Sequence, residues 1–377
     1  GGRYSAAAEA AWAWTPEEGR PAAGKAERRA DLAGSLFLDA RPSRNLRAFA
    51  KIRGEVRLTE TPLDPNVALH ELFVDFDLSE TAFFRLGKQT VEWGVGYFFS
   101  PADIINVGRI DPENPETERE GPVALRLHVP SGRDNFYAYA VVDGKPGAYR
   151  VALAPKVEFV VGRSEVGAGL YYRADRAPRA MATLSTSLGR FSLFGEAVLS
   201  KGSDKRFVEE VPASPDNPFG LAVVTDQNTL RFHGTVGVRA THSDPDGRFS
   251  VSAAGQYYYN GEGYDGEFTR ANRAAMLDLV SLGELSATDL TSMGRHYAAL
   301  SLSGTSRLLR DLTPAAFWLG NLSDGSGMLS LSLSYTRWES VRPSINVSRT
   351  YGNTGSEFAP LSPETRFTVS ITVARSW

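Results

Sequence analysis

Cysteine is missing from all 377 residues of the chain, and histidine is scarce. Without cysteine the protein has no disulfide and no thiolate zinc site, a composition compatible with the bacterial envelope. No two histidines stand at the HxxxH spacing of a paired metal site, so we expect neither a metal nor a cofactor. The histidines are His70, His128, His233, His242 and His296.

Long apolar runs are absent as well. No segment approaches the roughly 20 apolar residues that a membrane-spanning helix requires, but a β-barrel strand turns only every second residue toward lipid. The net charge is −3, so a general affinity for nucleic acid is not expected. The chain opens on GGRYSAAAEAAWAW, without a basic region followed by an apolar core. If the protein is exported, its signal peptide is already absent from this sequence.

What the sequence contains instead is a period of two. In LRAFAKIRGEVRL (Leu46–Leu58) the even positions are uncharged, while the odd positions carry arginine, lysine and glutamate. The next segment, Val67–Leu78, places Ala68 and Leu72 on an apolar face and acidic residues on the other. Each segment therefore predicts a strand with one apolar and one polar face.

The same alternation recurs along the chain and predicts about 18 strands, or 16 if the ambiguous stretches near 143–160 and 305–322 contribute fewer. Short turns alternate with long links, which is typical of a barrel with short periplasmic turns and long extracellular loops. The long links are 15–29, 94–121, 201–229, 261–294 and 352–364. The strands are expected near 4–14, 30–41, 46–58, 67–78, 82–93, 122–130, 134–142, 156–163, 166–174, 179–188, 190–200, 230–242, 248–260, 295–307, 313–321, 328–338, 342–351 and 365–377.

The chain shows no linker and no low-complexity tract, so we expect a single barrel domain over residues 1–377. Only one long link has a helical pattern. Within 261–294, the stretch Thr269–Gly283 has apolar residues at helical spacing and a glycine as a stop signal. We therefore expect a long extracellular loop that carries a short helix.

A soluble β-sandwich is the alternative, because it shares the period of two. Alanine and glycine are common on the apolar faces, and they would fill a sandwich core poorly, whereas lipid chains adapt to any surface. Aromatic residues also gather near strand ends, as in membrane-interface belts. We therefore expect an all-β, transmembrane, antiparallel up-and-down barrel in the bacterial outer membrane, closed because an open edge would leave backbone groups unpaired.

One segment, RLGKQTVEWGVGYFFSPADIIN (Arg85–Asn106), resembles a stretch of several bacterial outer-membrane barrel families, including alginate-export-like and uncharacterised porin-like proteins. Their pattern is roughly R-x-G-[RK]-Q, then WG, then an aromatic residue and P-x-D. The resemblance implies an outer-membrane barrel and says little about a substrate. The matching residues are Arg85, Gly87, Lys88, Gln89, Trp93, Gly94, Pro101 and Asp103.

The link 94–121 follows this motif and is strongly acidic. Arg85 and Gln89 share a strand face, so we expect them to bond a loop folded into the lumen. An acidic loop beside an arginine-rich wall predicts a pore constriction with a transverse field. The alternative is a solvated external loop, with the wall charges pairing among themselves. The loop residues expected at the constriction are Asp103, Arg109, Asp111, Glu113, Glu116, Glu118 and Glu120.

Charged residues on the polar strand faces are expected to line the pore and to pair across strands. Basic residues outnumber acidic ones there, which predicts a mild anion preference with the loop displaced and near neutrality with it in place. The expected pore-lining residues are Arg47, Lys51, Arg53, Glu55, Arg57, Glu71, Asp75, Asp77, Arg85, Gln89, Arg126, Arg173, Glu196, Arg231 and Arg239.

The last strand alternates almost to the end of the chain, and we expect it to pair with the first strand and close the barrel. Its aromatic end resembles the signal that the barrel-assembly machinery reads in outer-membrane barrels, with tryptophan in place of the commoner phenylalanine. The residues expected to form this signal are Phe367, Val369, Ile371, Val373 and Trp377.

These patterns predict a porin-like channel for passive diffusion of small hydrophilic solutes. The expected partners are outer-membrane lipid, the assembly machinery and the solutes, with no nucleic acid; a homo-oligomer is left open. The alternatives are a plugged structural or adhesive barrel and a barrel hydrolase. No GxSxG or GxxxxGK[ST] motif is present. The only route to a hydrolase is a serine–histidine pair around His233, so we expect no enzymatic activity.

Overall fold

The structure is a computed structural model that describes the backbone of residues 2–14, 16–17, 20–21, 25–58, 65–143, 149–215, 217–306, 309, 311–338, 340–359 and 365–376. All the strands predicted from the alternation are confirmed, and they form one 18-stranded sheet. Its strands are β1 (Gly2–Trp14), β4 (Lys25–Ser43), β5 (Leu46–Arg57), β6 (Asn66–Leu78), β7 (Ala82–Lys88), β8 (Val123–Ser131), β9 (Asp134–Asp143), β10 (Arg150–Val161), β11 (Ser164–Tyr171), β12 (Arg179–Leu188), β13 (Phe191–Lys201), β16 (Leu230–Ser243), β17 (Phe249–Asn260), β18 (His296–Ser306), β19 (Leu312–Asn321), β20 (Ser326–Tyr335), β21 (Val341–Tyr351) and β22 (Thr365–Ser376).

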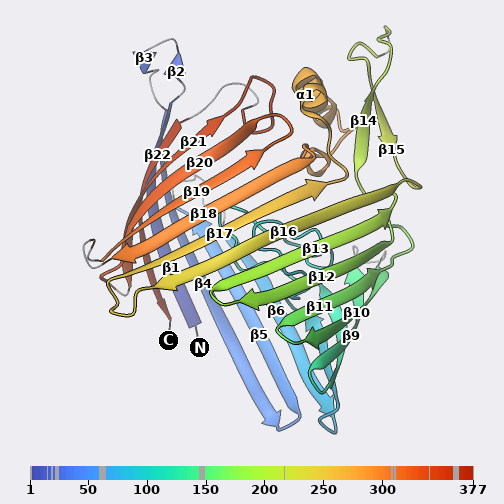
Figure 1. Cartoon of the computed structure of the whole chain (residues 1–377), viewed down its shortest axis with the longest axis vertical. Coiled ribbons are helices and arrows are strands. Elements are labelled where there is room, and N and C mark those ends of the chain that lie inside the picture. Colours follow the sequence, from blue (N-terminus) through green and yellow to red (C-terminus); the bar gives the residue numbers. More distant parts are fainter. Residues whose placement is uncertain are drawn as a thin grey trace.

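The sheet closes on itself as an antiparallel up-and-down barrel (Figure 1). Each strand pairs with the next strand along the chain, and β1 pairs with both β4 and β22. The last strand therefore meets the first, as predicted, with Arg3–Trp14 opposite Thr365–Ser376. Each of the 18 strands of this sheet is therefore paired on both sides, which is the condition for a sheet to sit in a hydrocarbon layer.

Three hairpins at one end of the barrel use the same dipeptide. Gly132, Gly162 and Gly189 have φ values of 63°, 63° and 62°, and each is followed by arginine. A type II′ turn requires a positive φ at its first central residue, which glycine adopts without strain. We call this end, where the connections are only a few residues long, the short-turn end, and the opposite end the long-loop end.

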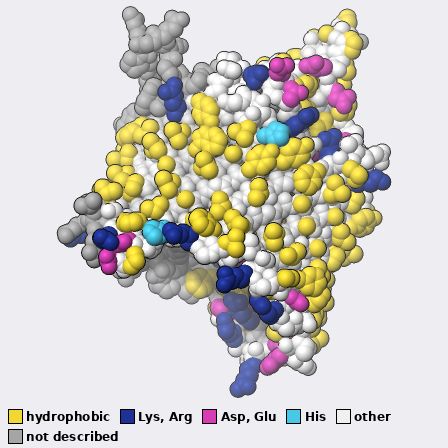
Figure 2. Space-filling model, in the orientation of Figure 1, with side chains coloured by type: hydrophobic (Ala, Val, Ile, Leu, Met, Phe, Trp, Pro, Cys, Tyr) yellow, Lys and Arg dark blue, Asp and Glu magenta, His cyan; other side chains and the backbone are white. Residues whose placement is uncertain are grey.

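The outer face of the barrel is apolar. Large side chains stand exposed along it, among them Leu36 (63% exposed), Leu38 (64%) and Val236 (61%). Figure 2 shows one side, where apolar side chains cover the strands and charged ones gather toward the two ends. This is the exterior of a transmembrane barrel, whose outward face meets lipid.

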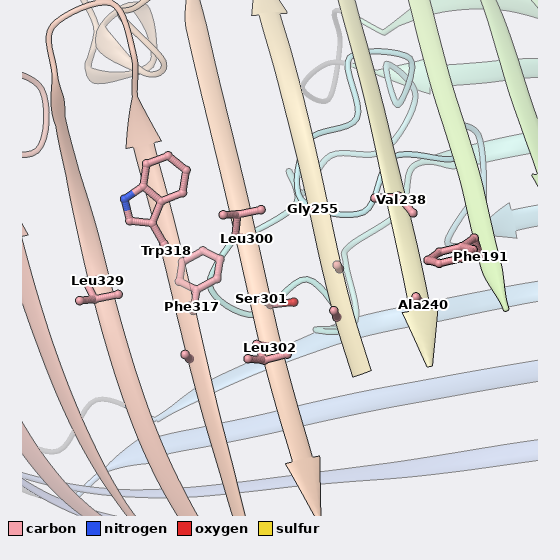
Figure 3. A pocket seen from close by; sticks show the side chains of 13 residues that line it. Phe191, Val238, Ala240, Gly255, Leu300, Ser301, Leu302, Phe317, Trp318 and Leu329 are labelled. Atoms are coloured by element: carbon pink, nitrogen blue, oxygen red, sulfur yellow. The ribbon is translucent and has the colours of Figure 1, made fainter. Parts of the chain in front are cut away.

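Small residues hollow out part of this outer face. A shallow depression of about 390 Å³ on this face is lined by Ala240, Ala253 and Gly255 together with Leu300 and Trp318. Figure 3 gives a close view of it. A protein core could not leave such a hollow open without losing contacts, whereas acyl chains can fill it. The alanine and glycine residues predicted on the lipid-facing surface therefore produce a depression in that surface.

One strand departs from strict alternation. β6 carries an extra residue where Lys51 and Ile52 of β5 pair with Glu71 and Leu69, so the register shifts by one at a β-bulge. The bulge places Ala68 opposite Arg53, on the inward face. The expectation that Ala68 faces lipid is therefore wrong, because a bulge reverses the facing of every residue beyond it.

The long-loop end carries the remaining elements. The helix expected at Thr269–Gly283 is α1 (Gly266–Ser281), whose N-cap Asp265 accepts a hydrogen bond from Phe268 N. A 3₁₀ helix (Ala287–Leu290) follows it. The short hairpins β2 (Pro16–Glu17) with β3 (Arg20–Pro21), and β14 (Arg206–Glu210) with β15 (Leu221–Thr225), were not predicted.

The loop elements pack on one another around a small apolar cluster. Val208 of β14, Leu221 of β15 and Met276 of α1 are nearly fully buried in it. The loop 201–229 and the loop 261–294 thus fold together above one side of the barrel (Figure 1). Among the described residues, no helix is both long and apolar enough to cross a membrane.

Candidate functional site

The segment 94–121, which we call the lumen loop, lies inside the barrel. It contacts inward side chains of strands far apart around the wall: Lys51 on β5, Glu196 on β13, Gln256 on β17 and Phe317 on β19. A segment can reach all of these strands only by crossing the lumen. The loop therefore folds inward, as the acidic pattern beside the motif predicted, and the alternative of a solvated external loop does not describe the geometry.

Glu196 is the main anchor of the lumen loop. Its carboxylate accepts hydrogen bonds from the backbone N–H groups of Val95 (2.5 Å), Gly96 (2.6 Å) and Ala102 (2.9 Å) and from Ser100 Oγ (2.9 Å). Only 5% of Glu196 is exposed. A buried carboxylate needs such donors, and these donors leave few other conformations for the loop.

Gly94, part of the sequence motif, makes this anchor possible. A Cβ on Gly94 would lie 2.0 Å from Ser100 Oγ and 2.5 Å from Glu196 Oε1. Any larger residue would therefore displace the carboxylate from its donors. The tryptophan before it, Trp93, is fully buried and packs edge-on against Tyr139 with ring centroids 5.2 Å apart.

Gln256 is a second anchor, and the sequence did not single it out. Its Oε1 accepts from the backbone N–H groups of Tyr97 (3.1 Å), Phe98 (2.7 Å) and Phe99 (3.3 Å), and its Nε2 donates to Phe99 O (2.5 Å). Nε2 also donates to Thr235 Oγ1 at 2.6 Å. The only sequence signal is a long amide that follows Ser250, Ser252 and Ala254 on one strand face.

The returning half of the lumen loop meets the basic wall through ion pairs. Three loop glutamates each approach a different cation on the wall, and Glu118 also lies 3.5 Å from His70. Within the loop, Asp103 pairs with Arg119. The three pairs are Glu116 with Arg239 at 3.6 Å, Glu118 with Lys51 at 2.6 Å and Glu120 with Lys88 at 2.5 Å.

Wall charges nearer the short-turn end pair with each other. Arg85 bonds Asp75 through Nε (2.5 Å) and Nη2 (3.0 Å). Arg47 bonds Asp39 at 2.9 Å and reaches Asp75 at 3.4 Å. The predicted cross-strand pairing of basic β5 with acidic β6 is present in the register, where Arg47 lies opposite Asp75.

The expected role of Arg85 and Gln89 as loop anchors is wrong. Arg85 is engaged by Asp75, as above. Gln89 is 1% exposed and donates from Nε2 to Ala124 O at 3.0 Å, so it ties β7 to β8. Both side chains act within the wall because β7 ends at Lys88, before the loop turns inward.

Other predicted residues lie on the same inward faces. Arg53 pairs with Glu55 at 3.6 Å, and Arg57 pairs with Asp31 at 3.4 Å. Glu71 accepts from Thr90 N at 3.4 Å. Asp77 accepts from Glu80 N at 3.0 Å, and Arg126 stands opposite Arg85.

Two predicted pore-lining arginines instead belong to the long-loop end. Arg173 lies beyond the end of β11 and pairs with Asp175 (2.7 Å) and with Asp143. Arg231 pairs with Asp226 at 2.6 Å. The hydrogen bond from the Thr229 backbone N–H lowers the pKa of Asp226 to about 2, and the hydrogen bond from Arg231 makes a smaller contribution in the same direction.

The middle of the lumen loop reaches the long-loop end. Arg109 Nη1 donates to Thr291 Oγ1 at 2.8 Å, which links the lumen loop to the segment after the 3₁₀ helix. Asp111 accepts from Glu113 N at 3.0 Å within a turn. Arg109 therefore connects the lumen loop with the 261–294 loop.

The arrangement around His233 is not that of a serine nucleophile. Its Nδ1 lies 3.3 Å from Tyr258 Oη, and its Nε2 lies 3.9 Å from Glu262. Among the described residues it forms no hydrogen bond with a serine. Across all the residues that the structure describes, no cluster of histidine, aspartate and glutamate side chains could hold a metal ion.

The last strand has the two faces expected of it. Phe367, Val369 and Ile371 pair with the outward residues Val347, Ile345 and Pro343, and Ile371 is 47% exposed. Val373 continues this face opposite Val341. Trp377, the predicted terminal anchor, lies outside the described residues.

No family model matches the chain, and no curated protein matches it in sequence. Solved outer-membrane barrels do match in structure. Their sequence identities to this chain are so low that the likeness shows a shared fold and no more. OccK8 (OprE) of Pseudomonas aeruginosa is 12% identical, with 100% of this chain and 98% of that chain covered and a TM-score of 0.53. OccAB1 of Acinetobacter baumannii is 11% identical, with 100% and 97% covered and a TM-score of 0.51.

A third solved structure carries a description of its ligand class. Wzi of Escherichia coli is described as an outer membrane protein involved in group 1 capsule assembly and as a carbohydrate-binding β-barrel. It is 10% identical, with 99% of this chain and 85% of that chain covered and a TM-score of 0.52.

Proposed function

We propose that the protein is an outer-membrane channel through which small hydrophilic solutes diffuse, with the lumen loop as its constriction. The short-turn end faces the periplasm and the long-loop end the exterior, as is usual for barrels of this kind. The observation that carries the proposal is the lumen loop itself, which Glu196 and Gln256 hold across the interior of a barrel with an apolar outer face.

The charges around the lumen loop set the ion preference of the proposed channel. Lys51, Lys88 and Arg239 each have a loop glutamate as partner, so the basic wall is neutralised where the loop meets it. We propose near-neutral selectivity with the loop docked and a mild anion preference once it is displaced, because displacement exposes these cations to the lumen.

Planar-bilayer recordings test both parts of this proposal. The full chain, reconstituted from detergent, should give discrete conductance steps, and a salt gradient should give a reversal potential close to zero. A clear cation preference would contradict the proposed charge balance. The absence of conductance steps, with protein shown to be inserted and folded, would contradict a channel.

The second outcome would favour a plugged structural or adhesive barrel. That alternative has one observation in its support, namely that Phe98 is buried against the wall together with Ala299 and Leu319, with Tyr97 and Phe99 partly buried beside it. Such packing would also suit a permanent plug. Conductance separates the two, because a plug and a constriction differ in whether a water-filled path remains.

We also propose that β22 carries the signal for barrel assembly, with Trp377 as its terminal aromatic. The support is the continuous outward apolar row from Phe367 to Val373 on the strand that closes the barrel. Deleting Trp377 should reduce the folded, membrane-inserted fraction in cells, measured by heat-modifiable gel mobility. Unchanged insertion of the truncated chain would refute this role.

A further inference from the structure

A hollow of about 340 Å³ lies near the short-turn end, on the inward side of β5 to β8 and beside the turn between β4 and β5. Its lining includes neither Glu196 nor Gln256, the anchors of the lumen loop. Arginine dominates its lining, and the arginines come from β4, the turn and three further strands. They are Arg41, Arg44, Arg47, Arg85 and Arg126.

Carboxylates compensate only part of this charge. Asp75 and Asp77 line the hollow, and Asp39 pairs with Arg47 beside it. Five arginines therefore face three aspartates. Arginine stays protonated at any physiological pH, so the excess of two positive charges does not depend on titration.

The aspartates fix the orientation of two guanidinium groups. Asp75 binds Arg85 through two nitrogens, and Asp39 binds Arg47 at 2.9 Å and 3.1 Å. The Arg85 guanidinium also lies 3.9 Å from the centre of the Phe73 ring. Side chains held in this way lose little entropy when they bind a further partner.

Arg126 is the unusual member of the group. It stands directly opposite Arg85 on the neighbouring strand, and like charges in that position destabilise a sheet. Its Nε is buried and has no hydrogen-bond partner among the described residues, although its guanidinium lies beside the Tyr139 hydroxyl. No carboxylate of the described residues lies within ion-pair distance of the Arg126 guanidinium. An anion between Arg85 and Arg126 would remove both costs.

We propose that this hollow is an anion-binding subsite, which takes the carboxylate or phosphate group of a small solute. Arg126 and Arg44 supply the charge that no aspartate compensates, and Arg47 and Arg85 present pre-oriented nitrogens beside them. Planar forked guanidinium groups match the oxygens of both anion types. The subsite rests on the proposed channel, since a solute reaches it through the lumen.

The test uses the full detergent-purified chain and two probes, inorganic phosphate and succinate, with glucose as a neutral reference. Calorimetric titration measures binding, and single-channel recording measures blockade of the KCl current by each probe. Arg126→Gln and Arg44→Gln remove one charge each, and Arg44 lies in an exposed turn whose substitution should not affect folding. Arg163→Gln, in another exposed turn at the same end, is the matched control.

Phosphate or succinate should bind the wild type and the control with equal affinity. Its affinity for Arg126→Gln should be about tenfold lower, as expected for the loss of one charge-assisted hydrogen bond. Arg44→Gln should weaken binding by a smaller factor, and glucose should not bind. Equal anion binding in wild type and both variants, or no anion binding in a conducting wild-type channel, would overturn the subsite and leave the channel standing. Anion binding without conductance would overturn the channel and keep the subsite.

Discussion

Two parts of the inner wall contrast in chemistry although their outer faces are alike. The inward faces of β4–β8, which we call the charged wall, carry the arginine, lysine and acidic residues described above. The inward faces of β17–β22, the hydroxyl wall, carry mainly serine and threonine. Among the described side chains of these six strands, the inward face is charged only at Arg342 and Arg366. The inward residues of the hydroxyl wall include Ser250, Ser252, Ser301, Ser303, Thr313, Ser330, Ser332, Ser334, Ser344, Asn346, Ser348, Thr368, Ser370 and Thr372.

The two walls hold themselves together differently. The charged wall uses ion pairs, such as Arg85 with Asp75, whereas the hydroxyl wall uses neutral contacts, such as Ser344 Oγ with Ser370 Oγ at 2.7 Å. Ion pairs are screened by salt, and neutral hydrogen bonds are much less so. The lumen loop bridges the two, bound to the charged wall by Lys51 and to the hydroxyl wall by Gln256. The asymmetry therefore predicts a field across the lumen that the loop partly cancels.

The largest effect should come from removing the anchor between the walls. Glu196→Ala leaves the donors of Val95, Gly96 and Ala102 without their acceptor. Each unsatisfied buried donor costs about 1–3 kcal/mol, so the docked loop should lose at least about 3 kcal/mol. The loop would then leave its position, and single-channel conductance and current noise should both rise.

Glu165→Gln is the matched control for this variant. Glu165 lies on β11 near the short-turn end, two strands and two residues away from Glu196, and among the described residues it makes no hydrogen bond or ion pair with the lumen loop. Its conductance should equal that of the wild type. An unchanged conductance in Glu196→Ala would mean that the loop does not define the narrowest part of the lumen.

A smaller effect is expected from reversing one charge where the loop meets the charged wall. Lys51→Glu places a carboxylate beside Glu118 and should shift the reversal potential toward cations. Lys51 and Glu118 are partly exposed, with side chains 19% and 44% accessible, so their coupling should be about 0.2–1 kcal/mol and should fall with salt.

The double variant Lys51→Glu with Glu118→Lys restores the pair in the opposite direction. Its reversal potential and stability should return toward the wild type, measured across a range of KCl concentrations. If the double variant behaves as the sum of the two single ones, the residues are not coupled and the loop is not held here by charge.

A still smaller shift should follow from charging the hydroxyl wall. Ser332→Asp places one carboxylate on β20, where the neighbours Ala315 and Asn346 are neutral. In a wet lumen a single charge acts through high dielectric, about 1 kcal/mol at 4 Å, so cation preference should rise only slightly. Ser332→Asn has the same shape without the charge and should leave the reversal potential unchanged. An equal shift in both variants would attribute the effect to size.

The contrast between the walls also shows what the sequence could predict. The outer apolar row depends only on alternation, and so the strands, the closure of β1 on β22 and the inward direction of Lys51 or Arg239 followed from local pattern. The bulge at β6 was missed, although the apolar residues change phase there, from Val67 and Leu69 at odd positions to Leu72 and the even positions after it.

Partners of side chains were harder to predict than their directions. Arg85 was expected to hold the lumen loop, but Asp75 is nearer because β7 ends before the loop begins. Gln256 holds it instead, and its partners lie 157 to 159 positions away in the chain. Pairings over such separations depend on where the loop settles inside the closed barrel, which no local pattern contains.

The smallest effect concerns pH and belongs to the hydroxyl-wall side. Glu357, in the loop after β21, accepts hydrogen bonds from Tyr297 Oη (2.5 Å), Asn321 Nδ2 (2.7 Å) and Met293 N (3.2 Å). Burial raises the pKa of Glu357 above its ordinary value of 4.5, despite the opposing effect of these donors. The Glu357 carboxyl therefore binds its proton more tightly when the loop 352–359 is docked in this position than when that loop is undocked.

Docking should accordingly be strongest below the ordinary glutamate pKa and should weaken as pH rises through the raised pKa of Glu357. Hydrogen exchange of residues 352–359 measures this, and Glu357→Gln, fixed in the neutral form, should remove the dependence. Comparing the two proteins at each pH cancels the intrinsic effect of pH on exchange, and Glu267→Gln on the exposed face of α1 serves as the control. Protection that rises with pH in the wild type relative to Glu357→Gln would mean that the charged carboxylate is the docked form, and the loop would then depend on charge as the opposite wall does.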